Sequence, residues 1–180
     1  MIPRISCALI SLSLPLFVAA CSGRSGQLNT NTTPAAAGSP AQRPATSVKF
    51  VKASAADVQI PAGGSAEATV TLLIQSGYHV NANPPTFSYL RATEVIVQTG
   101  EGISVGFITY PNPLIKKFSF AEIPLAVYEG SPTIKVMLKA IPTAAKGVRS
   151  LPAKLNVQAC DNQVCYAPGT LELSIPATVK

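Results

Sequence analysis

The sequence predicts an all-β protein with an immunoglobulin-like antiparallel β-sandwich fold, and three observations support this prediction. First, apolar and polar residues alternate with a period of two over several runs, as they do in half-buried strands. Second, turn-forming clusters rich in Gly and Pro separate the runs, at 61–64, 100–102, 129–132 and 146–147. Third, the chain holds 16 prolines and shows no convincing amphipathic helix. Seven to nine short strands with regular turns are typical of this fold.

Four runs show the alternation most clearly and supply the core of the predicted sandwich. They span residues 66–75, 134–140, 151–159 and 171–175. Within each run the apolar residues, for example Val70 and Leu72, share one face, which we expect to be buried. Shorter strand candidates lie at 48–51, 94–98 and 103–110.

Residues 1–20 have the features of a lipoprotein signal peptide. Arg4 supplies the positive start, and the apolar run that follows has about 14 residues, too few to span a membrane. The segment Val18-Ala19-Ala20-Cys21 then resembles the bacterial lipobox, whose cysteine thiol takes up diacylglycerol. Ordinary signal cleavage is the alternative, because Val18 and Ala20 also fit a small-x-small site. That alternative would leave Cys21 as an odd thiol in an oxidising compartment.

The mature chain divides into a lipidated cysteine with a flexible linker, residues 21–46, and one folded domain, residues 47–180. The linker is rich in Ser, Thr, Asn, Gln, Ala, Gly and Pro, so it cannot bury enough apolar surface to fold. We expect the lipid to be the only membrane attachment. By resemblance to Gram-negative lipoproteins, Ser22 after the cysteine favours the outer membrane, with the domain in the periplasm.

The positive charge of the chain does not indicate a nucleic-acid partner. The formal net charge is +6, and Lys116-Lys117 is the only adjacent pair of basic residues. Nucleic-acid binding needs a concentrated basic face with interleaved aromatic residues, which the sequence lacks. The charge instead favours solubility, or docking to an acidic partner.

Cys160 and Cys165 are the most informative residues of the predicted domain. Cys160 closes one predicted strand and Cys165 opens the next, and Asp161-Asn162 between them have turn-forming chemistry. A four-residue loop brings the two Cβ atoms within disulfide distance, and its position in a turn predicts good access. Two interpretations stay open here, a redox-active dithiol and a structural disulfide that staples a hairpin. A domain of this size can bury a core without so local a staple, which favours the redox interpretation.

Four segments of the chain resemble the N-terminal periplasmic domain of the thiol:disulfide interchange protein DsbD. They are 77–85 (GYHVNANPP), 110–120 (YPNPLIKKFSF), 125–130 (LAVYEG) and 158–168 (QACDNQVCYAP). The resemblance covers most of residues 47–180 and implies an immunoglobulin-like fold. It also implies a cysteine pair that relays electrons between thioredoxin-like domains, as part of a thiol-disulfide oxidoreductase or protein-disulfide reductase system.

The resemblance assigns roles to individual residues. It implies that Cys165, the second cysteine of the motif, forms the mixed disulfide with a partner, and that Phe118 or Phe120 belongs to a cap loop over the disulfide, with Phe118 favoured. Core packing is the other explanation for both phenylalanines. Asp161 beside Cys160 disfavours a thiolate there. The expected partners are thioredoxin-like periplasmic domains and a separate membrane electron transporter, because DsbD continues into a membrane domain and this sequence ends at Lys180.

Two further residues are possible auxiliaries of the pair. His79 is the only histidine, and either packing between loops or a place beside the sulfurs explains it. Tyr166 directly follows Cys165. We expect no metal, since two thiolates and one histidine make an incomplete ligand set, and no cofactor.

Overall fold

The computed structural model describes residues 46–180, and apart from one short 3₁₀ turn the regular elements of this part are all strands. They are η1 (Ser47–Lys49), β1 (Val51–Ala55), β2 (Val58–Ile60), β3 (Ser65–Ile74), β4 (His79–Asn81), β5 (Glu94–Val97), β6 (Ile103–Thr109), β7 (Leu114–Lys116), β8 (Leu125–Tyr128), β9 (Thr133–Ala140), β10 (Gly147–Val157), β11 (Ala159–Cys160) and β12 (Gly169–Val179). Within these residues no helix has the length and apolar character needed to cross a bilayer.

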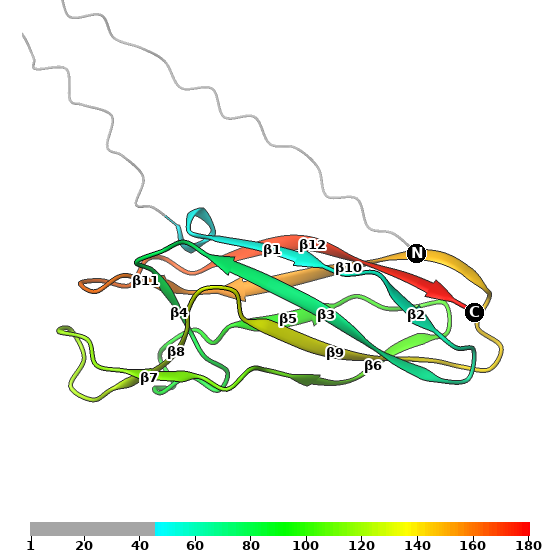
Figure 1. Ribbon diagram of the computed structural model, residues 1–180, viewed down its shortest axis with the longest axis horizontal. Coiled ribbons are helices and arrows are strands. Elements are labelled where there is room, and N and C mark those ends of the chain that lie inside the picture. Colours follow the sequence, from blue (N-terminus) through cyan, green and yellow to red (C-terminus); the bar gives the residue numbers. More distant parts are fainter. Residues whose placement is uncertain (1–45) are drawn as a thin grey trace, which may run out of the picture. The chain divides into compact units, whose positions relative to one another are not determined.

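Two four-stranded sheets form a β-sandwich (Figure 1). One has the order β1-β3-β9-β6 and the other β2-β12-β10-β5. Neighbouring strands are antiparallel except β2 and β12, which are parallel. In the predicted core runs every second residue turns inward, and Val70, Leu138 and Leu155 are fully buried. The predicted all-β, immunoglobulin-like sandwich is therefore confirmed.

A third, smaller sheet with the order β11-β4-β8-β7 lies at the end of the domain away from the C-terminus (Figure 1). The chain passes directly from β10 through Gln158 into β11, and β11 pairs with β4 of this small sheet. Gln158 holds this transition. Its side-chain oxygen accepts hydrogen bonds from the backbone N–H of Arg91 and from the side-chain amide of Asn81. The small sheet therefore places β11, and the cysteine that ends it, beside β4.

The structure corrects the predicted number of strands. It has twelve strands in the described residues, where the sequence predicted seven to nine. The additional strands β2, β4, β7, β8 and β11 have two to four residues, too few to show a period. The strand predicted to open at Cys165 begins only at Gly169.

The strand predicted at 48–51 is also wrong. A 3₁₀ turn occupies Ser47–Lys49, and the first strand begins at Val51. The Ser47 hydroxyl fixes this turn, since it donates to the carbonyl of Ala167 at 2.7 Å and accepts from the N–H of Ala159 at 2.9 Å. Gly169 lets the turn approach β12, because a Cβ there would lie 2.6 Å from a Val48 methyl group.

Candidate thiol–disulfide site

Cys160 and Cys165 form a disulfide across a four-residue loop. Two backbone hydrogen bonds flank the pair: the Asp161 N–H donates to the Val164 carbonyl at 3.0 Å, and the Tyr166 N–H to the Ala159 carbonyl at 2.9 Å. The cysteines are therefore directly opposite each other, with their Cα atoms 3.9 Å apart. The prediction that this loop brings the two side chains within bonding distance is confirmed.

The two cysteines differ in exposure. Cys160 has a strand partner on each side, His79 of β4 and Cys165, and its exposed fraction is 0%. Cys165 is partly exposed. The prediction of good access is therefore wrong for Cys160. Backbone on both sides of this residue, at His79 and at Cys165, covers it although a turn follows. An incoming thiolate can meet Cys165 far more readily than Cys160.

His79 is the buried neighbour of Cys160. As directly opposite residues of an antiparallel pair, their side chains lie on the same face of the small sheet. The imidazole stacks on the ring of Phe118, with centroids 4.1 Å apart. Its Nε2 atom is buried and has no hydrogen-bond partner among residues 46–180, an arrangement that costs about 1–3 kcal/mol.

The charge state of His79 follows from this burial. Desolvation lowers the pKa of His79 from 6.5 to about 4, and Glu129 only partly opposes this by favouring the imidazolium. Glu129 is itself paired with Lys116, whose ammonium lies 2.6 Å from its carboxylate. The imidazole beside Cys160 is therefore neutral at pH 7.

The segment 118–120 connects His79 to the cysteine loop. Phe118 is buried in a small core with Leu125 and Val127, so the core-packing explanation holds for it. Its ring stacks on Phe120 with centroids 5.4 Å apart, and Phe120 is 40% exposed. The Ser119 hydroxyl between them donates to the Asn162 carbonyl at 3.0 Å. One end of this segment thus contacts β4, and its middle is tied to the loop between the cysteines.

Asp161 organises the loop. One of its carboxylate oxygens accepts the backbone N–H groups of Gln163 and Val164, both at 2.8 Å, and the other accepts the Tyr166 hydroxyl at 2.6 Å. These bonds, led by that of Tyr166, lower the pKa of Asp161, and the same carboxylate raises the pKa of Tyr166. The sequence predicted turn-forming chemistry for Asp161 and Asn162, and a charge at Asp161 that disfavours a thiolate on Cys160. In the structure its carboxylate shapes the turn.

A groove of about 710 Å³ opens beside Cys165. Its lining is mainly apolar and comes from three segments: the loop between β4 and β5 (Phe87, Tyr89, Leu90), the segment 120–125 (Phe120, Ala121, Glu122, Leu125) and β10–β11 with the cysteine loop (Gln158, Gln163, Val164, Cys165). The rings of Phe87 and Tyr89 stack with centroids 5.1 Å apart, and Tyr89 is 76% exposed. Sequence reasoning missed this aromatic wall, since an exposed aromatic residue in a loop has no local pattern that marks it.

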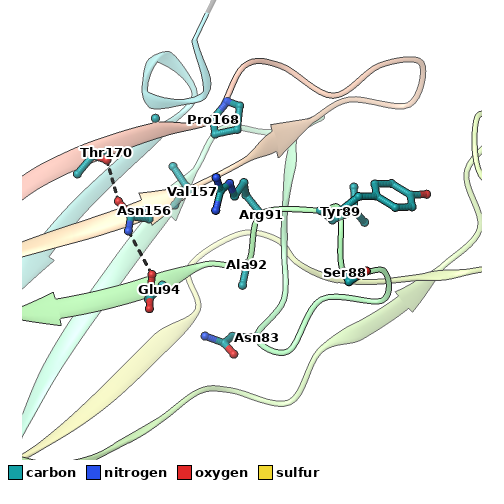
Figure 2. Close-up of a pocket in the computed structure, with 12 residues that line it drawn as sticks. Asn83, Ser88, Tyr89, Arg91, Ala92, Glu94, Asn156, Val157, Pro168 and Thr170 are labelled. Atoms are coloured by element: carbon teal, nitrogen blue, oxygen red, sulfur yellow. Dashed lines mark hydrogen bonds between the residues drawn. The ribbon is translucent and has the colours of Figure 1, made fainter.

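A second pocket, of about 930 Å³, shares Tyr89 and Leu90 with the groove but includes neither cysteine. Figure 2 shows a row of hydrogen bonds along its lining, from Thr170 of β12 to Asn156 of β10 at 2.7 Å and from Asn156 to Glu94 of β5 at 3.2 Å. These polar groups satisfy one another across three neighbouring strands. We therefore assign the candidate site to the groove beside Cys165.

The structure gathers the site residues predicted within the domain at one end. Cys160, Cys165, His79, Phe118 and Phe120 are linked by the contacts above. Tyr166 lies at the same end, where its hydroxyl donates a hydrogen bond to Asp161 and its ring packs on Phe50 and Tyr78. Cys21, the predicted signal peptide and the linker before residue 46 lie outside the described residues.

A comparison with protein families gives one match for this chain. The model of the family described as "Thiol:disulfide interchange protein DsbD, N-terminal" matches residues 47–176, a stretch that includes both cysteines of the disulfide. A search of curated proteins found no match.

A comparison with solved structures gives, among others, three matches of low sequence identity. The N-terminal periplasmic domain of ScsB from Proteus mirabilis is 20% identical, with a TM-score of 0.46, and the match covers 69% of this chain and 45% of that one. A family 123 glycoside hydrolase from Clostridium perfringens is 12% identical, with a TM-score of 0.33 and coverage of 73% and 28%. The CssB subunit of enterotoxigenic Escherichia coli is 13% identical, with a TM-score of 0.38 and coverage of 74% and 99%. The chain thus spans less than half of the ScsB structure.

Proposed function

Because the chain belongs to the family of the N-terminal domain of the thiol:disulfide interchange protein DsbD, we propose that Cys160 and Cys165 are a redox-active pair. In this proposal they exchange electrons with the dithiols of thioredoxin-like periplasmic proteins. The observation that carries the proposal is the asymmetry of the disulfide, in which a buried Cys160 is bonded to a partly exposed Cys165 at an apolar groove. A purely structural staple needs neither the groove nor the asymmetry.

The exchange proceeds through a mixed disulfide. A partner thiolate attacks the sulfur of Cys165, a new bond forms between these two sulfurs, and Cys160 leaves as a thiolate. The partner's second thiolate then attacks its own bonded sulfur, and Cys165 leaves as the second thiolate. Two electrons have moved from the partner, now a disulfide, to the pair, now reduced. Running the same steps backwards reduces a partner disulfide.

The segment 118–120 is proposed to gate this exchange. Phe120 and Cys165 line the same groove, and Ser119 holds the segment against the cysteine loop. Phe120→Ala should therefore speed reduction by dithiothreitol, since it removes a wall of the groove without opening the core. Phe118→Ala should also speed it, at the cost of about 3 kcal/mol of stability from the lost core ring. Unchanged reduction rates in both variants would remove the gate from the mechanism.

Trapping of partners tests the proposed function directly. In Cys160→Ser, Cys165 keeps a free thiol and Cys160 can no longer attack a mixed disulfide formed there, so the variant should accumulate mixed disulfides with thioredoxin-like periplasmic proteins. These adducts should disappear under reducing electrophoresis. Cys165→Ser is the matched control and should trap little, because Cys160 is buried. Adducts mainly through Cys160 would reverse the assigned roles, and no adduct in either variant would favour a structural disulfide in a binding or scaffold lipoprotein.

We also propose a lipid anchor at Cys21, outside the described residues, which would hold the domain in the periplasm at the outer membrane. The support is the lipobox-like segment 18–21 behind an apolar run. Electrons would then come from a separate membrane transporter. Cys21→Ser should move the protein from the membrane fraction to the soluble fraction. Retention of this variant in membranes would rule out the lipid as the attachment.

A further inference from the structure

Three side chains form a row on one face of the small sheet. His79 is the strand partner of Cys160, and Cys160 is directly opposite Cys165. Directly opposite residues in an antiparallel ladder place their side chains on the same face, about 4.5–5.5 Å apart at Cβ. The order across the strands is therefore imidazole, buried sulfur, partly exposed sulfur, with Phe118 stacked on the imidazole.

The imidazole carries an unused polar atom. His79 is 1% exposed, and its buried Nε2 has no hydrogen-bond partner within the described part of the chain. Buried polar atoms without partners are rare in native proteins, and a redox or catalytic role is one explanation for them. A disulfide sulfur is only a weak acceptor, whereas a thiolate on Cys160, the strand partner of His79, would be a strong one.

Cys160 would need a neighbouring group to stabilise it as a thiolate. It is fully buried at the end of a strand, so a negative charge there loses its hydration. The charged groups that act on His79 are Glu129, Lys116 and Asp161. Lys116 is paired with Glu129, and Asp161 is held by Tyr166 and the loop N–H groups.

We infer that His79 is a positioning residue for the exchange, whose neutral imidazole donates its Nε2–H to the sulfur of Cys160 when that sulfur becomes a thiolate. This inference rests on the proposed redox role of the pair. When a partner thiolate bonds to Cys165 and the disulfide breaks, Cys160 receives the electron pair of that bond, and the imidazole N–H stabilises the resulting charge. The hydrogen bond moves no electron and transfers no proton. In the reverse direction it favours the nucleophilic form of Cys160, which attacks Cys165 and releases the partner.

The tautomer of His79 gives the first test, and it needs no partner. Because His79 is the only histidine, a nitrogen-15 spectrum of the full chain, produced without a histidine tag, shows a single imidazole. At pH 7 in the disulfide state we expect the proton on Nε2, and after reduction by dithiothreitol above the thiol pKa we expect its resonance to move downfield. A proton on Nδ1 in both states would overturn the inference.

The pKa of the Cys160 thiol gives the second test. In Cys165→Ala the rate of alkylation of Cys160 by iodoacetamide should rise with pH, and the midpoint of this profile reports the thiol pKa whatever the access. Adding His79→Phe keeps an aromatic ring to stack on Phe118 but removes the N–H donor, which should raise the pKa of the Cys160 thiol. The alkylation rate at pH 7, divided by the plateau rate at high pH, should therefore fall about 10-fold. Adding His79→Gln restores an N–H donor and should recover part of the loss. Equal midpoints with and without His79 would overturn the inference.

These tests separate the inference from the proposed function. Trapping through Cys165 in Cys160→Ser does not involve a Cys160 thiolate, so it can succeed while the His79 tests fail. Failure of trapping with a shifted Cys160 midpoint would leave the hydrogen bond intact and refute the exchange with partners.

Discussion

Acidification should weaken the folded state through a single side chain, His79. Its pKa is about 4 in the folded protein against 6.5 for an unburied histidine. Between these values the unfolded chain binds a proton that the folded chain does not, so the free energy of unfolding decreases as the pH falls through this window. One pKa unit corresponds to about 1.4 kcal/mol, and integration between pH 7 and pH 5 gives a loss of about 2 kcal/mol. His79 is almost fully buried, so solvent screening reduces this figure little.

Urea denaturation of the oxidised protein at pH 7 and pH 5 measures this loss. With a slope of about 2 kcal/mol per molar urea, the midpoint should move down by roughly 1 M for the wild type. His79→Phe has no histidine left to titrate and keeps an aromatic ring against Phe118, so its midpoint should move far less. Asp161 does not obscure the comparison, because its hydrogen bonds lower its pKa and its contribution is lost only at a more acidic pH than this window. The other carboxylates are present in both proteins. A wild-type shift equal to that of His79→Phe would show that the imidazole is not held neutral.

Three further predictions concern the loop and the disulfide. The double variant Cys160→Ser/Cys165→Ser should still unfold cooperatively, and its free energy of unfolding should fall by about 2 kcal/mol, since the closed loop is short. A double variant that is unfolded at room temperature would show that the disulfide is structural. Ser119→Ala removes one hydrogen bond to the cysteine loop, worth about 1 kcal/mol, so dithiothreitol should reduce the disulfide up to about 5-fold faster; an unchanged rate would show that this bond does not restrain the segment. Tyr166→Phe should raise the pKa of Asp161 toward its ordinary value, which carbon-13 titration of the carboxyl would detect, and an unmoved pKa would contradict the assigned cause.

The sequence by itself determined the fold class and the cysteine pair of the candidate site. The alternation in 66–75, 134–140 and 151–159 identified residues such as Val70 and Leu155 as core, because burial on one face of a strand leaves a period of two. The pairing of the two cysteines could also be predicted from local sequence, because a four-residue loop is enough to bring their side chains together. The resemblance of four segments, 77–85, 110–120, 125–130 and 158–168, added the family, which the match over residues 47–176 confirms.

Only the tertiary structure decided what surrounds the sulfurs. His79 and Cys160 become neighbours through the pairing of β4 with β11, two strands of three and two residues that carry no periodic pattern. The same holds for Ser119 and Asn162, whose hydrogen bond joins loops distant in the sequence. The predicted access to Cys160 was wrong for this reason, because burial depends on which distant strands close over a residue. Strands of two or three residues show no period that could select a partner strand, so the asymmetry of the pair and the unpaired imidazole nitrogen emerge only when the chain has folded.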